Sequence, residues 1–217
     1  KQLTTGHTLK SDVGEIAVNH LSFQYETRTI FDNLSLSIKK GEKIAFVGES
    51  GSGKSTLIKL LLGLLKYDKG EIRLGDMELR DICLMDLYDK VRYLSQDTPV
   101  FDGSIKENLV FDKNVPEEQI WNALRKVQLS YFVEKLATGL DTQIGEKGTC
   151  LSGGEKQRLA LARLWFDDSE LVILDEATSA MDNLTEESVM KAVMQQLNGK
   201  TVIAIAHRLN SISGFDR

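Results

Sequence analysis

The sequence has few cysteines, no long apolar run and no excess of basic residues. Its two cysteines, Cys83 and Cys150, lack the spacing of a metal site, and a reducing cytosol suits them. The longest apolar stretch, residues 60–65, is broken by Gly63 and is far shorter than the ~20 apolar residues of a membrane helix. The formal net charge of −5 argues against a general nucleic-acid-binding surface. We therefore expect a soluble globular protein with no membrane span.

The length allows one large domain or two unequal lobes. With 217 residues and 41% hydrophobic content, the chain can bury a substantial core. Residues 1–13 are polar and lack the apolar core of a secretion signal. They are interpreted as a linker, and residues 14–217 are interpreted as the folded domain.

Two kinds of apolar pattern predict two layers of strands. Residues 16–23 alternate weakly and residues 34–38 alternate cleanly with serines, which is typical of half-buried strands in an antiparallel layer. Three other runs are apolar throughout, as strands covered on both faces should be. We expect them in a parallel sheet: residues 44–47, 171–174 and 202–206.

The segment 98–163 is predicted to be mostly helical. Within it, Pro116 stands near the start of a run with apolar residues at helical spacing, and proline is favoured in the first turn of a helix. A helical subdomain is therefore expected beside the parallel sheet.

A glycine-rich loop, GESGSGKST, directly follows the first buried strand and matches G-x-x-x-x-G-K-[ST], a loop that wraps phosphates. Glycine lets backbone N–H groups converge on an anion, because no Cβ blocks them. Lys54 adds a positive charge, Ser55 offers a hydroxyl to Mg²⁺, and a helix expected to begin at Thr56 points its positive end at the same anion. A flexible glycine turn would explain the glycines but not the Lys-Ser pair. The expected phosphate-binding residues are Gly48, Ser50, Gly51, Ser52, Gly53, Lys54, Ser55 and Thr56.

Two adjacent carboxylates, Asp175 and Glu176, end the apolar run LVILDE. The carboxyl end of a parallel strand is where an α/β sheet presents its ligands. Adjacent side chains point different ways, so Asp175 can serve a Mg²⁺ ion while Glu176 polarises an attacking water as general base. The alternative is a helix N-terminus that carries acidic residues.

A second glycine-bearing helix start occurs in LSGGEKQRLALAR, residues 151–163. One nucleotide does not need two such loops. Ser152, Gly153 and Gly154 would present a hydroxyl and N–H groups at a helix N-terminus, a phosphate site that could serve another chain's nucleotide. Ser152 is also predicted to cap this helix, with Glu155 completing a capping box, and the two interpretations are compatible.

The stretches GESGSGKST, LSGGE and LVILDE, in this order, resemble the nucleotide-binding domain of ATP-binding cassette (ABC) proteins over nearly the whole chain. The resemblance implies an α/β fold class: a P-loop NTPase (RecA-like) core with mixed sheet, an N-terminal antiparallel β layer and a helical subdomain. It also implies ATP and Mg²⁺ as ligands. In that family, two domains pair head to tail, as a homodimer or with a second cassette, and the LSGG helix of one closes on the ATP of the other.

Further positions match the family's motifs residue by residue. Gln96 resembles the glutamine that meets Mg²⁺ and senses the partner domain, and His207 resembles the histidine that contacts the γ-phosphate. Tyr25 stands where the family stacks an aromatic ring on adenine, although it could instead pack on the sheet. Residues 179–182 resemble the loop that crosses the dimer interface, with Met181 in place of leucine. The implied catalytic residues are Glu176, His207, Gln96 and Lys54, and the implied metal ligands are Ser55, Gln96 and Asp175.

Two segments resemble the exporter branch of the family. Residues 141–148 resemble the T-x-V-G-x-x-G segment carried just before LSGG, and residues 95–109 resemble a pattern in which an aromatic helps to receive a transmembrane domain. Here Val100 and Phe101 form an apolar knob on a polar loop, which suggests an interface, unless the loop folds back on the helical lobe. The resemblance implies a transmembrane domain fused before residue 1, a place at the cytoplasmic face of a membrane, and no nucleic-acid partner.

Two other functions stay open. A soluble ABC ATPase acting on nucleic acid or ribosomes would use the same ATP sandwich, although such proteins usually carry coiled-coil arms or a second cassette, and this sequence has neither. A small P-loop kinase would explain the phosphate loop but leave LSGGE without a role. The family normally continues through another strand pair and a helix after the position of His207, so the resemblance also implies that the domain is C-terminally shortened.

Overall fold

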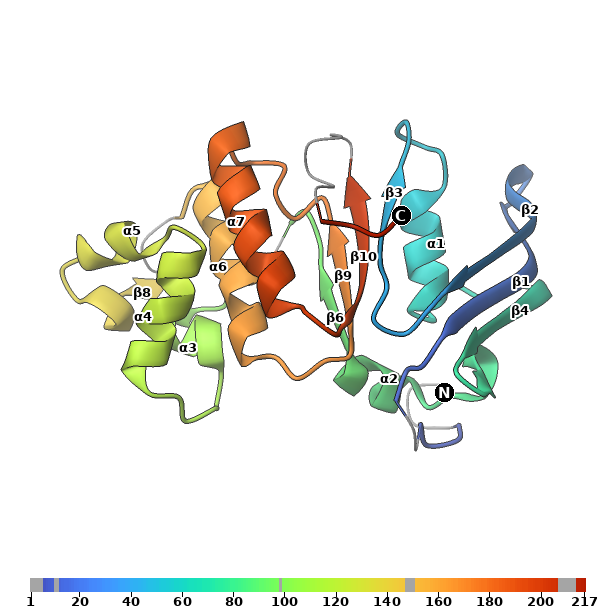
Figure 1. Ribbon diagram of the computed structural model, residues 1–217, viewed down its shortest axis with the longest axis horizontal. Helices are drawn as coiled ribbons and strands as arrows, with labels where there is room; N and C mark the ends of the chain where they lie inside the picture. Colours follow the sequence, from blue (N-terminus) through green and yellow to red (C-terminus); the bar gives the residue numbers. More distant parts are fainter. Residues whose placement is uncertain (1–5, 10–11, 98, 147–150, 207–213) are drawn as a thin grey trace.

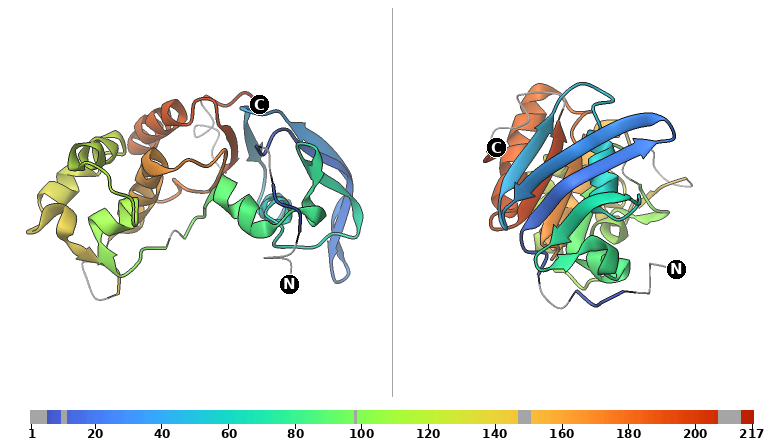
Figure 2. Two further views of the ribbon diagram at one scale, coloured as in Figure 1. Left: turned by 90° about the horizontal axis from the view of Figure 1, so that it is seen from below. Right: turned by 90° about the vertical axis from the view of Figure 1, so that its right-hand side faces the viewer.

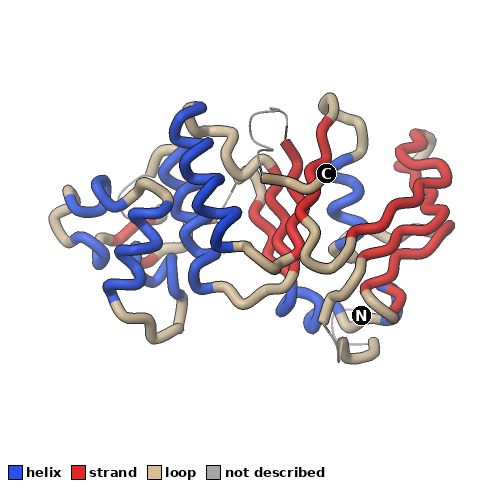
Figure 3. The backbone as a smooth tube through the Cα atoms, in the orientation of Figure 1, coloured by secondary structure: helices blue, strands red, loops and turns tan. Residues whose placement is uncertain are grey.

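The chain folds into layers, with helices gathered at one end and strands at the centre and the other end (Figure 3). The computed structural model describes residues 6–9, 12–97, 99–146, 151–206 and 214–217. In a view turned by 90°, the helical layer and the outer strands lie at the two ends of a curved arch (Figure 2).

The central layer is a sheet of parallel strands in the order β3-β10-β9-β6 (Figure 1). Strands β9 and β10 are apolar along almost their whole length because both faces of the sheet are covered. In β9, Val172 and Leu174 pack into the helical layer, whereas Leu171 and Ile173 pack on the opposite side. The three expected parallel strands are confirmed, and β6 joins them. Their bounds are β3 Lys43–Val47, β6 Val91–Leu94, β9 Leu171–Asp175 and β10 Thr201–Ala206.

A second, antiparallel sheet has the order β2-β1-β4-β5. Strand β1, Ile16–Tyr25, pairs with β2, Arg28–Ile38, so the expected N-terminal antiparallel layer is confirmed. Helix α1, Lys54–Leu61, lies between the two sheets and buries its apolar residues there (Figure 1). A single mixed core sheet was expected, but the described strands divide into separate sheets. All pairs in the core sheet are parallel. The antiparallel pairs lie in the second sheet and in a short pair formed by β7, Gly103–Ser104, and β8, Gln143–Ile144. The remaining elements on this side are β4 Lys69–Leu74, β5 Met77–Glu78, the 3-10 helix η1 Leu79–Asp81 and α2 Leu84–Lys90.

Helices α3 to α7 cover the other face of the parallel sheet. The predicted capping box of Ser152 and Glu155 is confirmed at the start of α6, and Ser104 and Glu107 form a second one at α3. Pro116 directly precedes α4, as expected. None of the described helices is long and apolar enough to span a bilayer. The bounds are β7 Gly103–Ser104, α3 Ile105–Val110, α4 Glu117–Lys126, α5 Ser130–Glu134, η2 Gly139–Asp141, β8 Gln143–Ile144, α6 Gly153–Ala162, η3 Arg163–Phe166 and α7 Asn183–Gln196.

The described residues of the N-terminal segment lie against the domain. Leu9 and Val13 are buried in the same core cluster as β1 and α1. The backbone N–H of Leu9 donates to the Asp86 carboxylate at 3.1 Å, and that of Val13 donates to the Glu170 carboxylate at 2.8 Å. The segment interpreted as a linker therefore has its last residues fixed to the domain.

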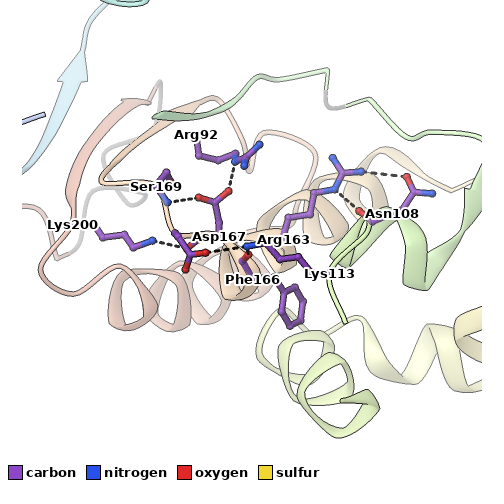
Figure 4. Close-up of polar contacts among 9 residues, drawn as sticks. Arg92, Asn108, Lys113, Arg163, Phe166, Asp167, Ser169 and Lys200 are labelled. Carbon is purple, nitrogen blue, oxygen red and sulfur yellow. Dashed lines mark hydrogen bonds and ion pairs between the residues drawn. The ribbon is translucent and has the colours of Figure 1, made fainter. Parts of the chain in front are cut away.

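A polar cluster joins the helical layer to the parallel sheet at the edge where the strands begin (Figure 4). Asp167, between η3 and β9, has a side chain that is 6% exposed and forms an ion pair with Arg92 of β6. It also accepts a hydrogen bond from the backbone N–H of Ser169 at 2.8 Å, and its carbonyl accepts one from Lys200 Nζ at 2.7 Å. Burial alone would raise the pKa of Asp167, but the hydrogen bonds from Ser169 and the charge of Arg92 outweigh it and hold the pKa below its ordinary value.

Replacing Asp167 with asparagine keeps the shape of this side chain but removes its charge. We expect the free energy of unfolding at pH 7 to fall by about 1–3 kcal/mol, the usual contribution of hydrogen bonds to a charged group. A carboxyl with a depressed folded pKa stabilises the fold above its unfolded pKa, and this stabilisation is lost as the pH falls through the folded pKa. The difference between wild type and Asp167→Asn in urea unfolding should therefore shrink as the pH falls below about 4.

The neighbouring Asp168→Asn is the matched control, because the Asp168 side chain is 98% exposed and pairs only with an exposed lysine. Asp168→Asn should change the free energy of unfolding by no more than about 0.5 kcal/mol. Equal effects of the two substitutions, or a difference that does not change with pH, would contradict the structural role of Asp167.

Candidate functional site

Three of the segments singled out in the sequence follow parallel strands at one edge of the core sheet. Ile205 of β10 pairs with both Phe46 of β3 and Asp175 of β9. The loop after β3 and Glu176 after β9 therefore begin about 10 Å apart, which is two strand spacings. Gln96 follows β6 at the same edge. The phosphate loop, the two carboxylates and Gln96 therefore all stand where strands of one sheet end.

The phosphate loop enters α1 in a conformation that requires glycine. Gly51 and Gly53 have φ angles of 82° and 98°, in the region that only glycine adopts freely. A Cβ on Gly53 would lie 2.9 Å from Cγ2 of Ile30 in β2, so the second sheet also excludes a side chain there. Helix α1 begins at Lys54, two residues before Thr56, and this corrects the expected start. The reason is that Gly53 turns the chain directly into the helix.

The ammonium group of Lys54 lies inside this loop. Nζ donates to the carbonyl oxygens of Gly48 and Glu49, both at 2.7 Å, and to the Ser52 hydroxyl at 3.1 Å. The loop therefore folds around one positive charge. Phosphate oxygens are stronger acceptors than these neutral groups because they are charged. The arrangement suits exchange of the carbonyl contacts for an anion.

The carboxylate of Asp175 is oriented by the strand beside it. The Tyr93 hydroxyl of β6 donates to Asp175 Oδ2 at 2.9 Å. Burial of Tyr93 and this hydrogen bond raise the pKa of the phenol, so the hydroxyl keeps its proton and remains a donor. Asp175 therefore has a fixed orientation at the end of β9.

Glu176 adopts a left-handed backbone conformation, with φ of 53°. Its N–H donates to the Ile205 carbonyl at 3.2 Å, and its own carbonyl accepts from the N–H of Ser179 at 3.1 Å. A residue other than glycine in this region costs about 1–3 kcal/mol, and such strain gathers at functional sites. The chain therefore leaves the extended conformation of β9 directly after Asp175, and the two adjacent carboxylates are carried by different backbone conformations.

The LSGG segment lies on the other side of the sheet from the phosphate loop. Ser152 and Gly153 are exposed at the start of α6. Gly153 lines a cleft of about 630 Å³ together with Gln96 and Ala180. Figure 1 places α6 and α1 on opposite sides of the parallel sheet. Within one chain, the two segments expected to bind phosphate therefore lie on opposite sides of the sheet.

Tyr25 and His207 are the expected site residues outside these segments. Tyr25 is the last residue of β1, is 42% exposed, and packs edge-on against Phe23 with ring centroids 4.9 Å apart. It thus keeps exposed ring surface while it also contacts the sheet. His207 lies outside the described residues. In the part of the chain that the structure describes, no group of three or more His, Cys, Asp or Glu side chains could hold a metal ion.

Sequence reasoning missed three polar side chains that organise this edge: Tyr93, Gln157 and Glu186. Gln157 of α6 and Glu186 of α7 are each 4% exposed. Glu186 accepts a hydrogen bond from the Thr178 hydroxyl at 2.5 Å, and Gln157 contacts the same loop. The available signal was a polar residue at an apolar helical position, since Gln157 stands four residues before Leu161.

An exposed aromatic pair lies on the surface of the helical layer. Phe101, the expected apolar knob, is 51% exposed, and it packs edge to face against Phe111 with centroids 5.8 Å apart. The guanidinium of Arg163 lies 5.7 Å and 5.6 Å from the two centroids and donates to the Asn108 carbonyl at 2.8 Å. Burial and the charge of Arg92 lower the pKa of Arg163 to about 10, so it remains charged at neutral pH. The Phe101 ring therefore keeps about half of its surface exposed, whereas Val100, the other residue of the expected knob, packs against the helical core, and the Asn108 side chain bonds the Phe101 backbone to α3.

Comparison with known proteins identifies a family and several relatives. The family model described as "ABC transporter" matches residues 31–179. The uncharacterized ABC transporter ATP-binding protein YwjA of Bacillus subtilis is 40% identical over 206 residues, which are 94% of this chain and 36% of that protein. The ATP-dependent lipid A-core flippase 2 of Colwellia psychrerythraea is 40% identical over 212 residues, 96% of this chain and 36% of the flippase.

A solved structure of a bacterial Atm1-family ABC exporter with ATP bound is also similar. It matches with a TM-score of 0.86 and 29% identity, over 98% of this chain and 38% of that chain. This chain spans about a third of the length of the curated relatives named above.

The left-handed backbone of Glu176 predicts an unusual response to glycine. Glu176→Gly and Glu176→Ala both remove the carboxylate, but only glycine adopts a positive φ without strain. The glycine variant should therefore be the more stable by about 1 kcal/mol. Glu187, exposed in α7, is the control position, where the same pair should differ by about 1 kcal/mol in favour of alanine. Urea unfolding of the four variants measures both differences. If Glu176→Gly is the less stable of its pair, the loop does not hold this conformation in solution.

Proposed function

Because the chain belongs to the ABC transporter family, as its ATP-binding and ATP-hydrolysing domain, we propose that it is the motor domain of an exporter. The observation that carries this proposal is the similarity, over 98% of the chain, to an ATP-bound Atm1-family ABC exporter. In this proposal, two such domains pair head to tail around ATP, and hydrolysis separates them. The cycle of pairing and separation drives transport across a membrane.

The loop between β3 and α1 is the proposed phosphate site. Lys54 exchanges its contacts with the Gly48 and Glu49 carbonyls for phosphate oxygens. The glycines leave backbone N–H groups accessible, and the N-terminus of α1 adds a positive potential. Tyr25 stacks its exposed ring on the adenine. The remaining proposed contacts are Ser50, Gly51, Ser52, Gly53, Ser55 and Thr56.

The proposed Mg²⁺ ligands are Ser55, Gln96 and Asp175. All three offer oxygen atoms, which a hard cation prefers, and they come from segments that meet at one edge of the sheet. Bound Mg²⁺ would neutralise charge on the β- and γ-phosphate oxygens. Tyr93 keeps the Asp175 carboxylate in one orientation through its hydrogen bond.

Glu176 is the proposed general base. Its carboxylate accepts a proton from a water whose oxygen bonds to the γ-phosphorus, while the bond from that phosphorus to the bridging oxygen of ADP breaks. The left-handed turn at Glu176 supports this role because strained backbone of this kind gathers at functional sites. His207 is proposed to contact the γ-phosphate, and Gln96 is proposed to meet Mg²⁺ and to sense the partner domain. The products are ADP and phosphate.

A second chain is proposed to complete the site. Since α6 and α1 lie on opposite sides of the sheet, Ser152 reaches a nucleotide held by Lys54 only when the two residues belong to different chains (Figure 1). Ser152, Gly153 and Gly154 then cover the γ-phosphate with a hydroxyl and the positive end of a helix. A two-fold axis completes both sites at once, in a homodimer or with a second cassette.

The aromatic pair of Phe101 and Phe111 is the proposed contact with a transmembrane domain. Exposed aromatic rings backed by a charged arginine are typical of interface centres. The domain would then lie at the cytoplasmic face of a membrane, attached to spans outside this chain. Neither the relatives, which are named as transporters and flippases, nor the net charge of −5 favours the alternative function on nucleic acid or ribosomes.

Glu176→Gln tests the proposed function, because it keeps the shape of the base but removes its proton acceptor. Phosphate release should fall by roughly 10²-fold or more, while calorimetric ATP affinity is retained. Lys54→Ala is the contrasting variant and should weaken ATP binding itself. Light scattering should show the Glu176→Gln chain as a dimer in the presence of ATP and as a monomer in the presence of ADP. Near-normal turnover, or pairing that ignores the nucleotide, would refute the proposal.

A further inference from the structure

Gln157 is a buried amide that joins α6 to the loop after β9. Its Oε1 accepts from the N–H of Ala180 at 2.9 Å, and its Nε2 donates to the Ser179 hydroxyl at 3.0 Å. The Glu176 carbonyl lies 3.5 Å from the same Nε2, at the limit of a hydrogen bond. A buried amide persists in an apolar layer when its polar atoms are paired. All of these partners belong to one loop, residues 176–180.

The start of α6 is also in close contact with this loop. A Cβ on Gly154 would lie 3.1 Å from the Ala180 carbonyl oxygen, and a Cβ on Gly153 would lie 3.3 Å from Cβ of Ala180. Side chains at these two positions would push the loop away or shift the helix. The two glycines therefore do more than uncover N–H groups: they let the end of α6 that carries Ser152 rest directly on the loop.

Two other elements hold the same loop in place. On the side of β10, the N–H of Glu176 donates to Ile205. On the side of α7, Thr178 donates to the buried carboxylate of Glu186. Neither β10 nor α7 carries an LSGG residue. The hydrogen bonds of Gln157, together with the close approach of Gly153 and Gly154 to Ala180, link the loop to the helix that presents Ser152.

We propose that Gln157 is a positioning residue through which the LSGG helix of a chain sets the general base of that same chain. When Ser152 contacts the partner's ATP, the position of α6 becomes fixed. Through its hydrogen bonds, Gln157 then fixes the position of residues 176–180 relative to α6. Glu176 then aligns over the ATP in its own phosphate loop. One side chain thereby connects the two nucleotides of the dimer, and this connection rests on the proposed two-chain site.

The test places Gln157→Met in one or the other chain of a mixed dimer. Methionine has a similar volume but none of the hydrogen bonds. The active chain keeps Glu176, and the silent chain carries Glu176→Gln and does not hydrolyse ATP. A limiting amount of the active chain is mixed with an excess of the silent chain, so that every active chain pairs with a silent one. Gln157→Met in the active chain should lower kcat by about tenfold or more, since misplacing a reacting group by about 1 Å can cost about 10²-fold. Its KM for ATP should stay unchanged. The same substitution in the silent chain should have an effect within about twofold.

The matched control is Arg158→Met, one position along α6. Arg158 anchors the helix to the Gln128 carbonyl at 2.9 Å and does not contact the loop. In the active chain it should change kcat by no more than about twofold, and the melting temperatures of both variants are measured beside kcat to separate a loss of stability from a loss of alignment. A similar loss of kcat in both variants would mean that Gln157 only stabilises α6, which overturns the proposal.

The remaining outcomes depend on the chain in which Gln157→Met lowers kcat. A larger loss from the silent chain, an equal loss from both chains, no loss from either, or a raised KM with unchanged kcat each overturn the proposal. A separate arm checks its premise: the silent chain is given Ser152→Arg in addition to Glu176→Gln. If the active chain then turns over as before, the second chain does not complete the site, and the proposed function fails whatever Gln157 does.

Discussion

The geometry of the site depends on one short loop, residues 175–180, being fixed at the edge of the parallel sheet. Asp175 still belongs to β9, whereas Glu176 turns into the left-handed region with φ of 53°. Without glycine, such a turn persists only where the surroundings hold it. Here Ile205 of β10 and the buried side chains of Gln157 and Glu186 supply those contacts. The loop is therefore as much a product of α6 and α7 as of the strand that precedes it.

The parallel sheet gives this loop its surroundings and also limits what one chain can do. Both faces are covered, by α1 and the antiparallel sheet on one side and by α3 to α7 on the other (Figure 1). This double burial makes the strands apolar, and it also separates the phosphate loop from LSGG. In a single chain, the two proposed half-sites therefore lie on opposite sides of the sheet. Pairing two chains is the simplest way in which both halves meet one nucleotide.

Local patterns predicted much of this structure. The buried strands follow from apolar runs, and the Ser152 cap follows from the residues of one helical turn. The start of α1 was misplaced because the turn at Gly53 depends on contact with β2, a strand earlier in the chain. Tyr93 and Gln157 were missed for the same reason, since their partners lie 82 and 23 residues away. His207 was predicted from its motif alone and lies outside the described residues. Periodicity shows which face of an element is buried, but not which polar side chain of another element lies against that face.

The most direct measurement of the central claim, that each ATP is enclosed by two chains, is a mixture of two inactive variants. Lys54→Ala removes the phosphate-loop charge, and Ser152→Arg blocks the LSGG surface that covers the partner's nucleotide. In random pairs, half of the dimers are mixed, and each has one of its two sites intact. The account predicts that ATPase activity returns clearly above that of either variant alone, with about a quarter of the wild-type value as the upper limit, because the base of the intact site belongs to the Ser152→Arg chain, whose own LSGG helix is not seated on a nucleotide. If the mixture stays as inactive as either variant alone, the site is not shared between chains.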